Sequence, residues 1–217
     1  MKFARFFVAV GVLAASCGAN ALVIGSLGGG AGPFATLSSP TPGVAGTGGT
    51  LSGGVSATII GGAVYAADMS FADDVVPGEN FLAAGPTPGG FGTPNTATLT
   101  FGGGGVSYIS FLWGSPDTYN TLTVNSIGGG SQTFTATGTG FGVAFPVTNG
   151  DQTFSQAVQF SGIGGSLITS LVFASTTNAF EVGRFTVQAP VPEPETYGLM
   201  LAGLAVLSFK ARRRRRD

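Results

Sequence analysis

The chain has 217 residues, which is enough for one medium-sized domain with terminal segments. It contains no histidine, and its single cysteine is Cys17, so the usual parts of nucleophilic triads and zinc sites are missing. Lysine and arginine gather at the two ends, whereas the interior has seven acidic side chains and only Arg184 as a cation. An interior with this charge cannot neutralise a phosphate backbone, which argues against nucleic acid as a partner.

The N-terminus has the three parts of a secretory signal peptide. These parts are the basic residues Lys2 and Arg5, the apolar run 6–15, and the small-x-small cleavage site Ala19-Asn20-Ala21. The pattern predicts export by the Sec machinery and cleavage after Ala21 by signal peptidase, which defines residues 1–21 as the signal peptide. The alternative is a lipoprotein signal that uses Cys17, but the leucine expected three positions earlier is absent.

Short strand-like runs recur along the middle of the chain. Residues 22–54 are mainly Gly, Ala, Ser, Thr and Pro, and we expect a loose leader there with at most one strand. Beyond them, runs rich in Val, Ile, Thr and Phe alternate with Gly- or Pro-rich turns. The predicted strands are residues 55–65, 96–101, 106–113, 119–127, 132–137, 152–160, 167–174 and 179–188.

Two of these runs indicate how the strands pack. In the run 106–113, Ile109, Phe111 and Trp113 share one face and the other face is also apolar, which is typical of a central strand in a sandwich. In the run 179–188 the apolar phase slips at Gly183-Arg184, which predicts a β-bulge. The predicted fold class is all-β. We expect a two-sheet, jelly-roll-like β-sandwich over residues 55–189, flanked by the signal peptide and a C-terminal transmembrane helix.

Carboxylates are the remaining candidates for chemistry in the interior. Two of them could serve as the acid and base of a glycosidase, but no spacing singles out a pair, and solvated loop residues are the plainer interpretation. We therefore assign no catalytic residue. The seven interior carboxylates are Asp68, Asp73, Asp74, Glu79, Asp117, Asp151 and Glu181.

One acidic segment could bind calcium. In FADDVVPGEN, the side chains of Asp73, Asp74 and Glu79 offer the oxygen ligands that this hard ion prefers. The segment lacks the DxDxDG order of a calcium loop, so an ordinary acidic loop is the alternative. No other cofactor is expected.

Three aromatic residues could form a platform for a sugar ring. These residues are Tyr108, Trp113 and Tyr119. A tryptophan in a sandwich strand is more often a core residue, and we favour that interpretation for Trp113.

The C-terminal segment, residues 190–217, combines a motif, an apolar run and a basic cluster. The triplet Pro192-Glu193-Pro194 precedes the apolar residues 197–209, which would extend about 20 Å as a helix. Only with its flanking residues would this helix approach the ~30 Å thickness of a hydrocarbon core. Arginines after it would remain cytoplasmic and leave the body on the other side of the membrane. The cluster consists of Arg212, Arg213, Arg214, Arg215 and Arg216.

This order resembles the PEP-CTERM sorting signal of exosortase substrates. The resemblance implies that Pro192, Glu193 and Pro194 mark the chain for exosortase, a membrane-embedded cysteine protease or transpeptidase, while the helix anchors it transiently in the inner membrane. It further implies loss of the tail and release or attachment of the body at the cell surface or in the extracellular matrix. Such proteins are typical of Gram-negative bacteria that make extracellular polysaccharide. An arginine run can also bind nucleic acid, but the exported body and the apolar run favour sorting.

The body resembles segments of one group of exosortase-dependent surface proteins, and no enzymatic activity is implied. The matching segments are NFLAAGPTPGGFGTPNTATLTF, VSYISFLWGSPDTYNTLTV and LVFASTTNAFEVGRFTV. We expect a non-enzymatic exported surface or matrix protein associated with extracellular polysaccharide or biofilm. One alternative is a secreted polysaccharide-acting enzyme that uses Asp117 and Glu181, the acidic residues of those segments. Another is a calcium-dependent carbohydrate-binding module.

Overall fold

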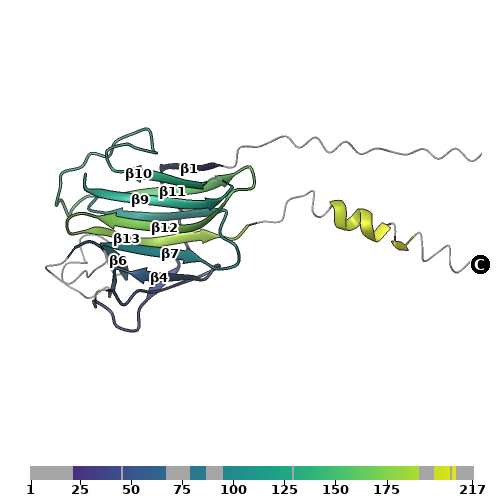
Figure 1. Ribbon diagram of the computed structural model, residues 1–217, viewed down its shortest axis with the longest axis horizontal. Coiled ribbons are helices and arrows are strands. Elements are labelled where there is room, and N and C mark those ends of the chain that lie inside the picture. The colour runs from purple at the N-terminus through teal and green to yellow at the C-terminus, as the bar shows by residue number, and fades with distance from the viewer. Residues whose placement is uncertain are drawn as a thin grey trace, which may run out of the picture.

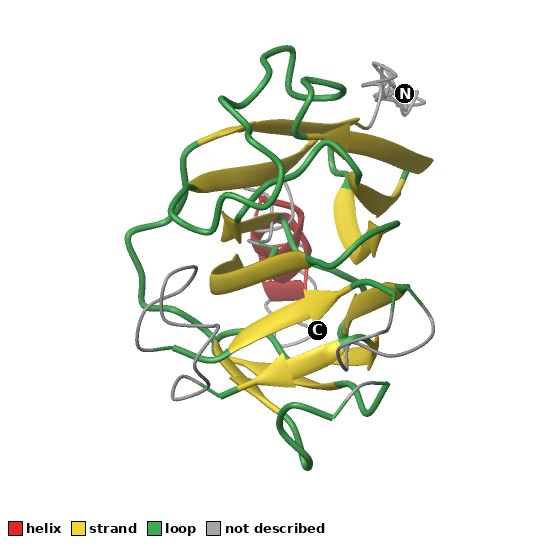
Figure 2. Cartoon of the chain, turned by 90° about the vertical axis from the view of Figure 1, so that its left-hand side faces the viewer, coloured by secondary structure: helices red, strands yellow, loops and turns green. Residues whose placement is uncertain are grey.

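The protein is a β-sandwich of two antiparallel sheets, as the sequence predicts. The computed structural model describes residues 22–44, 46–66, 79–86, 95–128, 130–190, 198–205 and 207–208. Within them lie thirteen strands, which Figure 1 shows as layered arrows. Figure 2 shows strands and loops in the body, and the helical residues belong to the C-terminal segment.

Each sheet has a simple antiparallel order. Sheet A has six strands, in the order β1 (Leu22–Leu27), β11 (Ser155–Ile163), β8 (Tyr108–Gly114), β13 (Phe180–Gln188), β6 (Phe81–Ala84) and β5 (Ala63–Tyr65). Sheet B has seven, in the order β10 (Gly130–Thr135), β9 (Asn120–Ile127), β12 (Leu167–Ser175), β7 (Thr96–Phe101), β4 (Ala57–Gly61), β3 (Gly49–Ser52) and β2 (Thr36–Ser38).

Aromatic side chains fill the space between the sheets. Phe111 of β8 packs against Phe160 and Phe173, with ring centroids 5.7 and 5.5 Å apart. Trp113, on the same face of β8, is fully buried and stacks on Phe180 at 4.2 Å between centroids. The alternation predicted for this strand is therefore confirmed, and Trp113 is a core residue. Burial of large rings on this scale is the main source of the sandwich's stability.

The predicted strand 55–65 is in fact two strands in different sheets. Strand β4 belongs to sheet B and β5 to sheet A, and the chain crosses between them at Gly61 and Gly62. Both glycines have positive φ, 76° and 62°. At Gly62 a Cβ would lie 2.6 Å from the Ala83 carbonyl oxygen and 2.7 Å from the Ala97 Cβ, so only glycine fits this crossing.

The N-terminal part of the sandwich was underestimated from the sequence. Residues 22–54 contain three strands rather than a leader with at most one: β1 pairs with β11, while β2 and β3 extend sheet B beyond β4. Composition hid them because β2 and β3 are short and rich in Gly, Ser and Thr. Strand β6, residues 81–84, was also missed. By contrast, the bulge predicted in β13 is confirmed by a register shift between Gly183 and Thr186.

The outer faces of the two sheets differ. On sheet A, residues 28–35, which we call the strap, cross the sheet: the Gly30 N–H donates to Ser110 Oγ at 2.8 Å and the Ala35 N–H to the Phe185 carbonyl at 2.6 Å. Ser110 and Thr186 beneath it are buried. No strap of this kind is seen over sheet B in the part of the chain described, where outward side chains alternate with buried ones and remain half-buried or exposed.

We call the outward side of sheet B the hydroxyl face. One row of paired residues crosses all seven strands, and every member carries a hydroxyl or amide group. The row is Ser131, Asn125, Ser170, Thr100, Thr58, Thr50 and Ser38. Figure 1 shows β10, β9, β12, β7 and β4 following one another in this order.

The described residues of the C-terminal segment after residue 190 are helical. Helical residues are described only at 198–205 and 207–208, and they are exposed. Among the described residues, no helix has both the length and the apolar character needed to cross a membrane. The transmembrane helix expected from the apolar run is therefore not seen.

Candidate functional site

Strand pairing brings together two acidic residues that the sequence offered as a pair. Glu181 of β13 lies opposite Gly114 at the end of β8, and Asp117 follows three residues later. Asp117 is 1% exposed and Glu181 is 5% exposed. The segments that carry the two residues thus meet at one end of sheet A, and we call Asp117 and Glu181 the carboxyl pair.

Backbone and amide groups hold the loop that carries Asp117. The Gly150 N–H donates to Asp117 Oδ1 at 2.7 Å. Next to it, the Thr118 N–H donates to Asn149 Oδ1 at 3.0 Å, and Asn149 Nδ2 donates to Thr118 Oγ1 at 2.9 Å. These contacts join the loop after β8 to the loop before β11 and fix the position of the Asp117 carboxyl.

A second set of hydrogen bonds ties the start of β9 to the segment before β13. Asn120 is fully buried, donates to the Ala179 carbonyl at 3.3 Å and accepts from Ser175 Oγ at 2.7 Å. The Tyr119 hydroxyl donates to the Asn178 carbonyl at 3.3 Å. Sequence inspection missed this role of Asn120 and Ser175, because their contact depends on the pairing of β9 with β12.

Burial dominates the electrostatics of the carboxyl pair. Burial, followed by the charge of Asp117, raises the pKa of Glu181 to about 8. Burial also raises the pKa of Asp117, although the Gly150 N–H and the Tyr119 and Asn120 side chains act in the opposite direction. The pKa of Tyr119 rises to about 12 through burial and its interaction with Asp117. At neutral pH burial therefore favours the protonated form of Glu181.

The position of the carboxyl pair limits what it can do. Acid–base cleavage of a glycosidic bond requires two carboxyl groups that flank the bond. At 1% and 5% exposure, Asp117 and Glu181 reach a polysaccharide only if the surrounding loops rearrange. The pair is instead enclosed near the end of β8, where Glu181 of β13 lies opposite Gly114 and burial favours its protonated form.

The three predicted aromatic residues do not form one platform. Trp113 is buried between the sheets, so neither ring face is open to a sugar. Tyr108 lies on the opposite face of β8, where its hydroxyl donates to Gln159 Oε1 at 3.0 Å. Tyr119 belongs to the surroundings of the carboxyl pair.

The predicted calcium ligands are only partly described. Asp73 and Asp74 lie outside the described residues, and Glu79 Oε1 is 3.4 Å from Arg184 Nε. Over the ranges that the structure covers, no group of three or more His, Cys, Asp or Glu side chains gathers as a metal site. The processing residues also lie outside the described ranges: Ala19, Ala21, Pro192, Glu193, Pro194 and Arg212 to Arg216.

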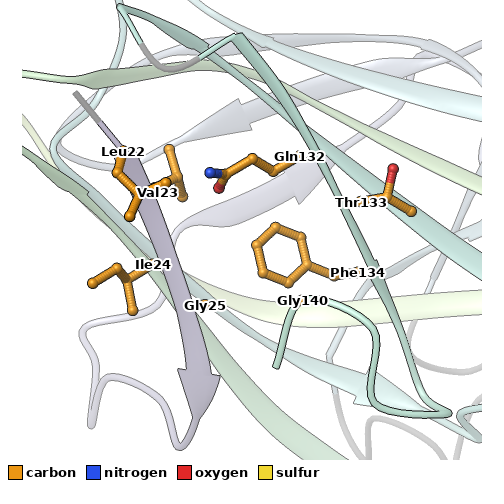
Figure 3. Close-up of a pocket in the computed structure, with 8 residues that line it drawn as sticks. All are labelled: Leu22, Val23, Ile24, Gly25, Gln132, Thr133, Phe134 and Gly140. Atoms are coloured by element: carbon orange, nitrogen blue, oxygen red, sulfur yellow. The ribbon is translucent and has the colours of Figure 1, made fainter. Parts of the chain in front are cut away.

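A hollow of about 430 Å³ opens where the edge strands β1 and β10 meet (Figure 3). Its walls are mainly apolar, with Val23 and Phe134 facing each other across it. Gln132 projects toward β1, and its Oε1 is buried with no hydrogen-bond partner in the structure. Leu22, the first residue after the predicted signal cleavage, also lines the hollow. Sequence inspection gave no signal for it, since it depends on two edges from different sheets.

Comparison with known proteins identifies the C-terminal segment. Residues 190–216 match the family model of the PEP-CTERM protein-sorting motif. No curated protein and no solved structure matched the chain. The predicted resemblance is therefore confirmed for the tail: this chain carries, at residues 190–216, the PEP-CTERM protein-sorting motif of exported, exosortase-processed proteins.

Proposed function

We propose that the sandwich is the mature, non-enzymatic body of a surface or matrix protein that exosortase separates from its tail. The observation that carries this proposal is the spacing between body and motif. The last strand, β13, ends at Gln188, and the sorting motif begins at residue 190. Cleavage at the motif would remove the tail without breaking a strand.

The route to the surface follows from the two ends of the chain. Export by the Sec machinery and removal of residues 1–21 by signal peptidase would release Leu22, where β1 already begins. The C-terminal segment would then hold the chain at the inner membrane of a Gram-negative cell until exosortase acts. The body would finally join extracellular polysaccharide outside the cell.

A non-enzymatic role is supported by the burial of the carboxyl pair. Asp117 and Glu181 are the two candidates for acid–base chemistry, and both are almost fully enclosed. Hydrolysis of polysaccharide by this pair is the alternative. Asp117→Asn and Glu181→Gln should leave glycan binding intact under our proposal, whereas loss of glycan cleavage would support the enzyme.

Intact-mass spectrometry of the protein from its native host tests the sorting step. The wild-type mass should correspond to a chain that begins at Leu22 and ends near Pro192–Pro194, with or without an added group. A variant with Pro192, Glu193 and Pro194 all changed to alanine should keep the arginine cluster and remain with the membranes. Pro190→Ala, which removes a neighbouring proline but keeps the triplet, should be processed normally. A wild-type mass that still includes Arg212 to Arg216 would contradict the proposal.

A further inference from the structure

We propose that the hydroxyl face of sheet B is the surface that binds polysaccharide, and that its ligand is a neutral polymer. This inference deepens the proposed function, on which it rests for the presence of extracellular polysaccharide, by naming the surface and the class of glycan. It depends on the order, the charge and the chemistry of the outward side chains.

Hydrogen bonds within the face fix its polar groups in place. Ser131 Oγ donates to Asn125 Oδ1 at 2.5 Å, and Asn125 Nδ2 donates to Ser170 Oγ at 2.9 Å. At the other edge, the hydroxyls of Ser38 and Thr50 are 2.8 Å apart. Side chains that are already ordered lose little conformational entropy when a ligand binds, so the face is preorganised.

The spacing of the groups suits a repeating partner. Neighbouring strands are about 4.8 Å apart, and alternate residues along a strand are about 6.8 Å apart, so the rows form a regular lattice of donors and acceptors. A polysaccharide presents hydroxyl groups at regular intervals along its chain. Many weak contacts to one polymer add up through multivalency, even though each hydrogen bond contributes little.

The charge of the face selects a neutral ligand. None of the seven strands of sheet B contains Asp, Glu, Lys or Arg, although exposed surfaces usually carry many. A neutral glycan therefore binds without the desolvation of an ion, which is costly. The acidic residues elsewhere in the body would repel an anionic polymer, and the face has no cation to attract one.

Aliphatic groups among the hydroxyls match the two-sided chemistry of a sugar ring. Ile60 is 71% exposed and lies opposite Thr98, which in turn lies opposite Val172. A pyranose ring has C–H groups on its faces and hydroxyls at its edge. A surface that alternates methyl and hydroxyl groups can contact both. Contact with a sugar ring would also remove apolar surface of the exposed Ile60 side chain from water, which is favourable.

The face also has a recessed end. A hollow of about 520 Å³ lies along β3, β4 and β7, and Thr50, Thr58 and Thr100 of the hydroxyl row are among the residues that line it. Ligand sites in proteins are commonly concave. This hollow is where a glycan chain that runs along the row would be enclosed most closely.

Affinity electrophoresis of the full-length chain in mild detergent tests the inference. The gels contain a neutral polymer, galactomannan or hydroxyethylcellulose, or the anionic polymer alginate. We expect at least one neutral polymer to retard the protein and alginate to have little effect. Replacing Thr58, Thr98 and Thr100 together with valine keeps the β-branched shape but removes three hydroxyls, and should lower the affinity about tenfold or more.

Two variants that each add a carboxylate, one to each sheet, locate the binding surface. Thr100→Glu places a carboxylate in the hydroxyl row and should abolish retardation, whereas Ser161→Glu makes a similar change on the outer side of sheet A and should not. Circular dichroism and melting temperature confirm that each variant is folded.

Three results would overturn the inference. The first is no retardation by any neutral polymer when the mass spectrum shows normal processing, since sorting would then be right and the surface wrong. The second is equal retardation of Thr100→Glu and wild type. The third is a dimer that Thr100→Glu converts to a monomer without any effect of glycan, because the face would then bind a second copy. Glycan binding together with a native-host mass that still includes Arg212 to Arg216 would instead disprove sorting alone.

Discussion

Sheet A and sheet B share a core but present different outer sides. The strap crosses sheet A and buries Ser110 and Thr186, and this sheet also holds Glu181 and Arg184, the charged residues among the thirteen strands. Sheet B has no charged side chain and keeps an open hydroxyl face. Sheet A is thus charged and partly covered by the strap, whereas the outer side of sheet B is uncharged and open to a partner. The following experiments would sharpen or break this division.

The largest effect is expected in the shared core. Trp113→Ala removes a fully buried ring that stacks on Phe180, and should lower the free energy of unfolding by about 3–5 kcal/mol. Thr100→Val, on the hydroxyl face, should change it by less than about 0.5 kcal/mol. Chemical denaturation measures both. A similar cost at the two positions would mean that the hydroxyl face is part of the folding core.

The carboxyl pair should make stability depend on pH. The native state keeps on Glu181, with its pKa of about 8, a proton that the unfolded chain releases near 4.5. The free energy of unfolding should therefore fall as pH rises from about 4.5 to 8, by up to about 1.4 kcal/mol per pH unit. The stabilisation that comes from the raised pKa of Glu181 is fully present below about pH 4.5 and is lost above about pH 8.

Substitutions distinguish the source of this slope. Glu181→Gln removes the titrating group and should flatten the dependence over that range, while Glu79→Gln, a change at a half-exposed carboxyl, should preserve it. Denaturation series at half-unit pH steps provide the measurement. A slope that persists in Glu181→Gln would mean that another group causes the pH dependence.

The crossing between the sheets should tolerate no side chain. Gly62→Ala forces a Cβ against the Ala83 carbonyl and the Ala97 methyl at a positive φ, and should destabilise the protein by about 1–3 kcal/mol. Gly103→Ala is the matched control, with a φ of 66° and no atom within 4 Å of the added carbon. Thermal melts of the two variants separate collision from backbone strain. Equal losses would leave strain as the sole cause.

The smallest effect is expected at the ion pair between Arg184 of β13 and Glu79. Arg184→Gln should lower the free energy of unfolding by at most about 1 kcal/mol, because its ion pair with Glu79 is partly exposed. Chemical denaturation measures this change.

Since Glu79 faces the Arg184 cation, we also expect calcium or EDTA to leave the melting temperature unchanged. A rise of several degrees on adding calcium would restore the calcium-binding module as the better description of this protein.

How far the sequence predicts the structure depends on whether a feature is local. Strand β7 was predicted with its observed bounds, 96–101, and the bulge near Arg184 was read from a slip in apolar phase. The crossing at Gly62 was not predicted, because two adjacent glycines do not reveal that the strands on either side join different sheets. The acidic residues Asp117 and Glu181 were singled out by resemblance, but their burial required the fold.

The hydroxyl face shows the same limit more clearly. Each strand of sheet B contains Ser or Thr in alternate positions, which is ordinary for strands. That Thr58, Thr100 and Ser170 stand in one row depends on the registers of three strands that are far apart in the sequence. Periodicity within a strand predicts which face of the sheet a side chain lies on. Its neighbours on the adjacent strands are known only from the register in the tertiary structure.

The pairing of β1 has a consequence for the timing of folding. Leu22 lies opposite Ile163, and the strap that follows β1 is held at Ala35 by the Phe185 carbonyl. A chain exported N-terminus first must therefore wait for its last strands before its first strand finds a partner. Contacts this distant in sequence close slowly. An exported protein gains from the delay, because sheet A cannot be completed, and so cannot obstruct translocation, until nearly the whole body has crossed.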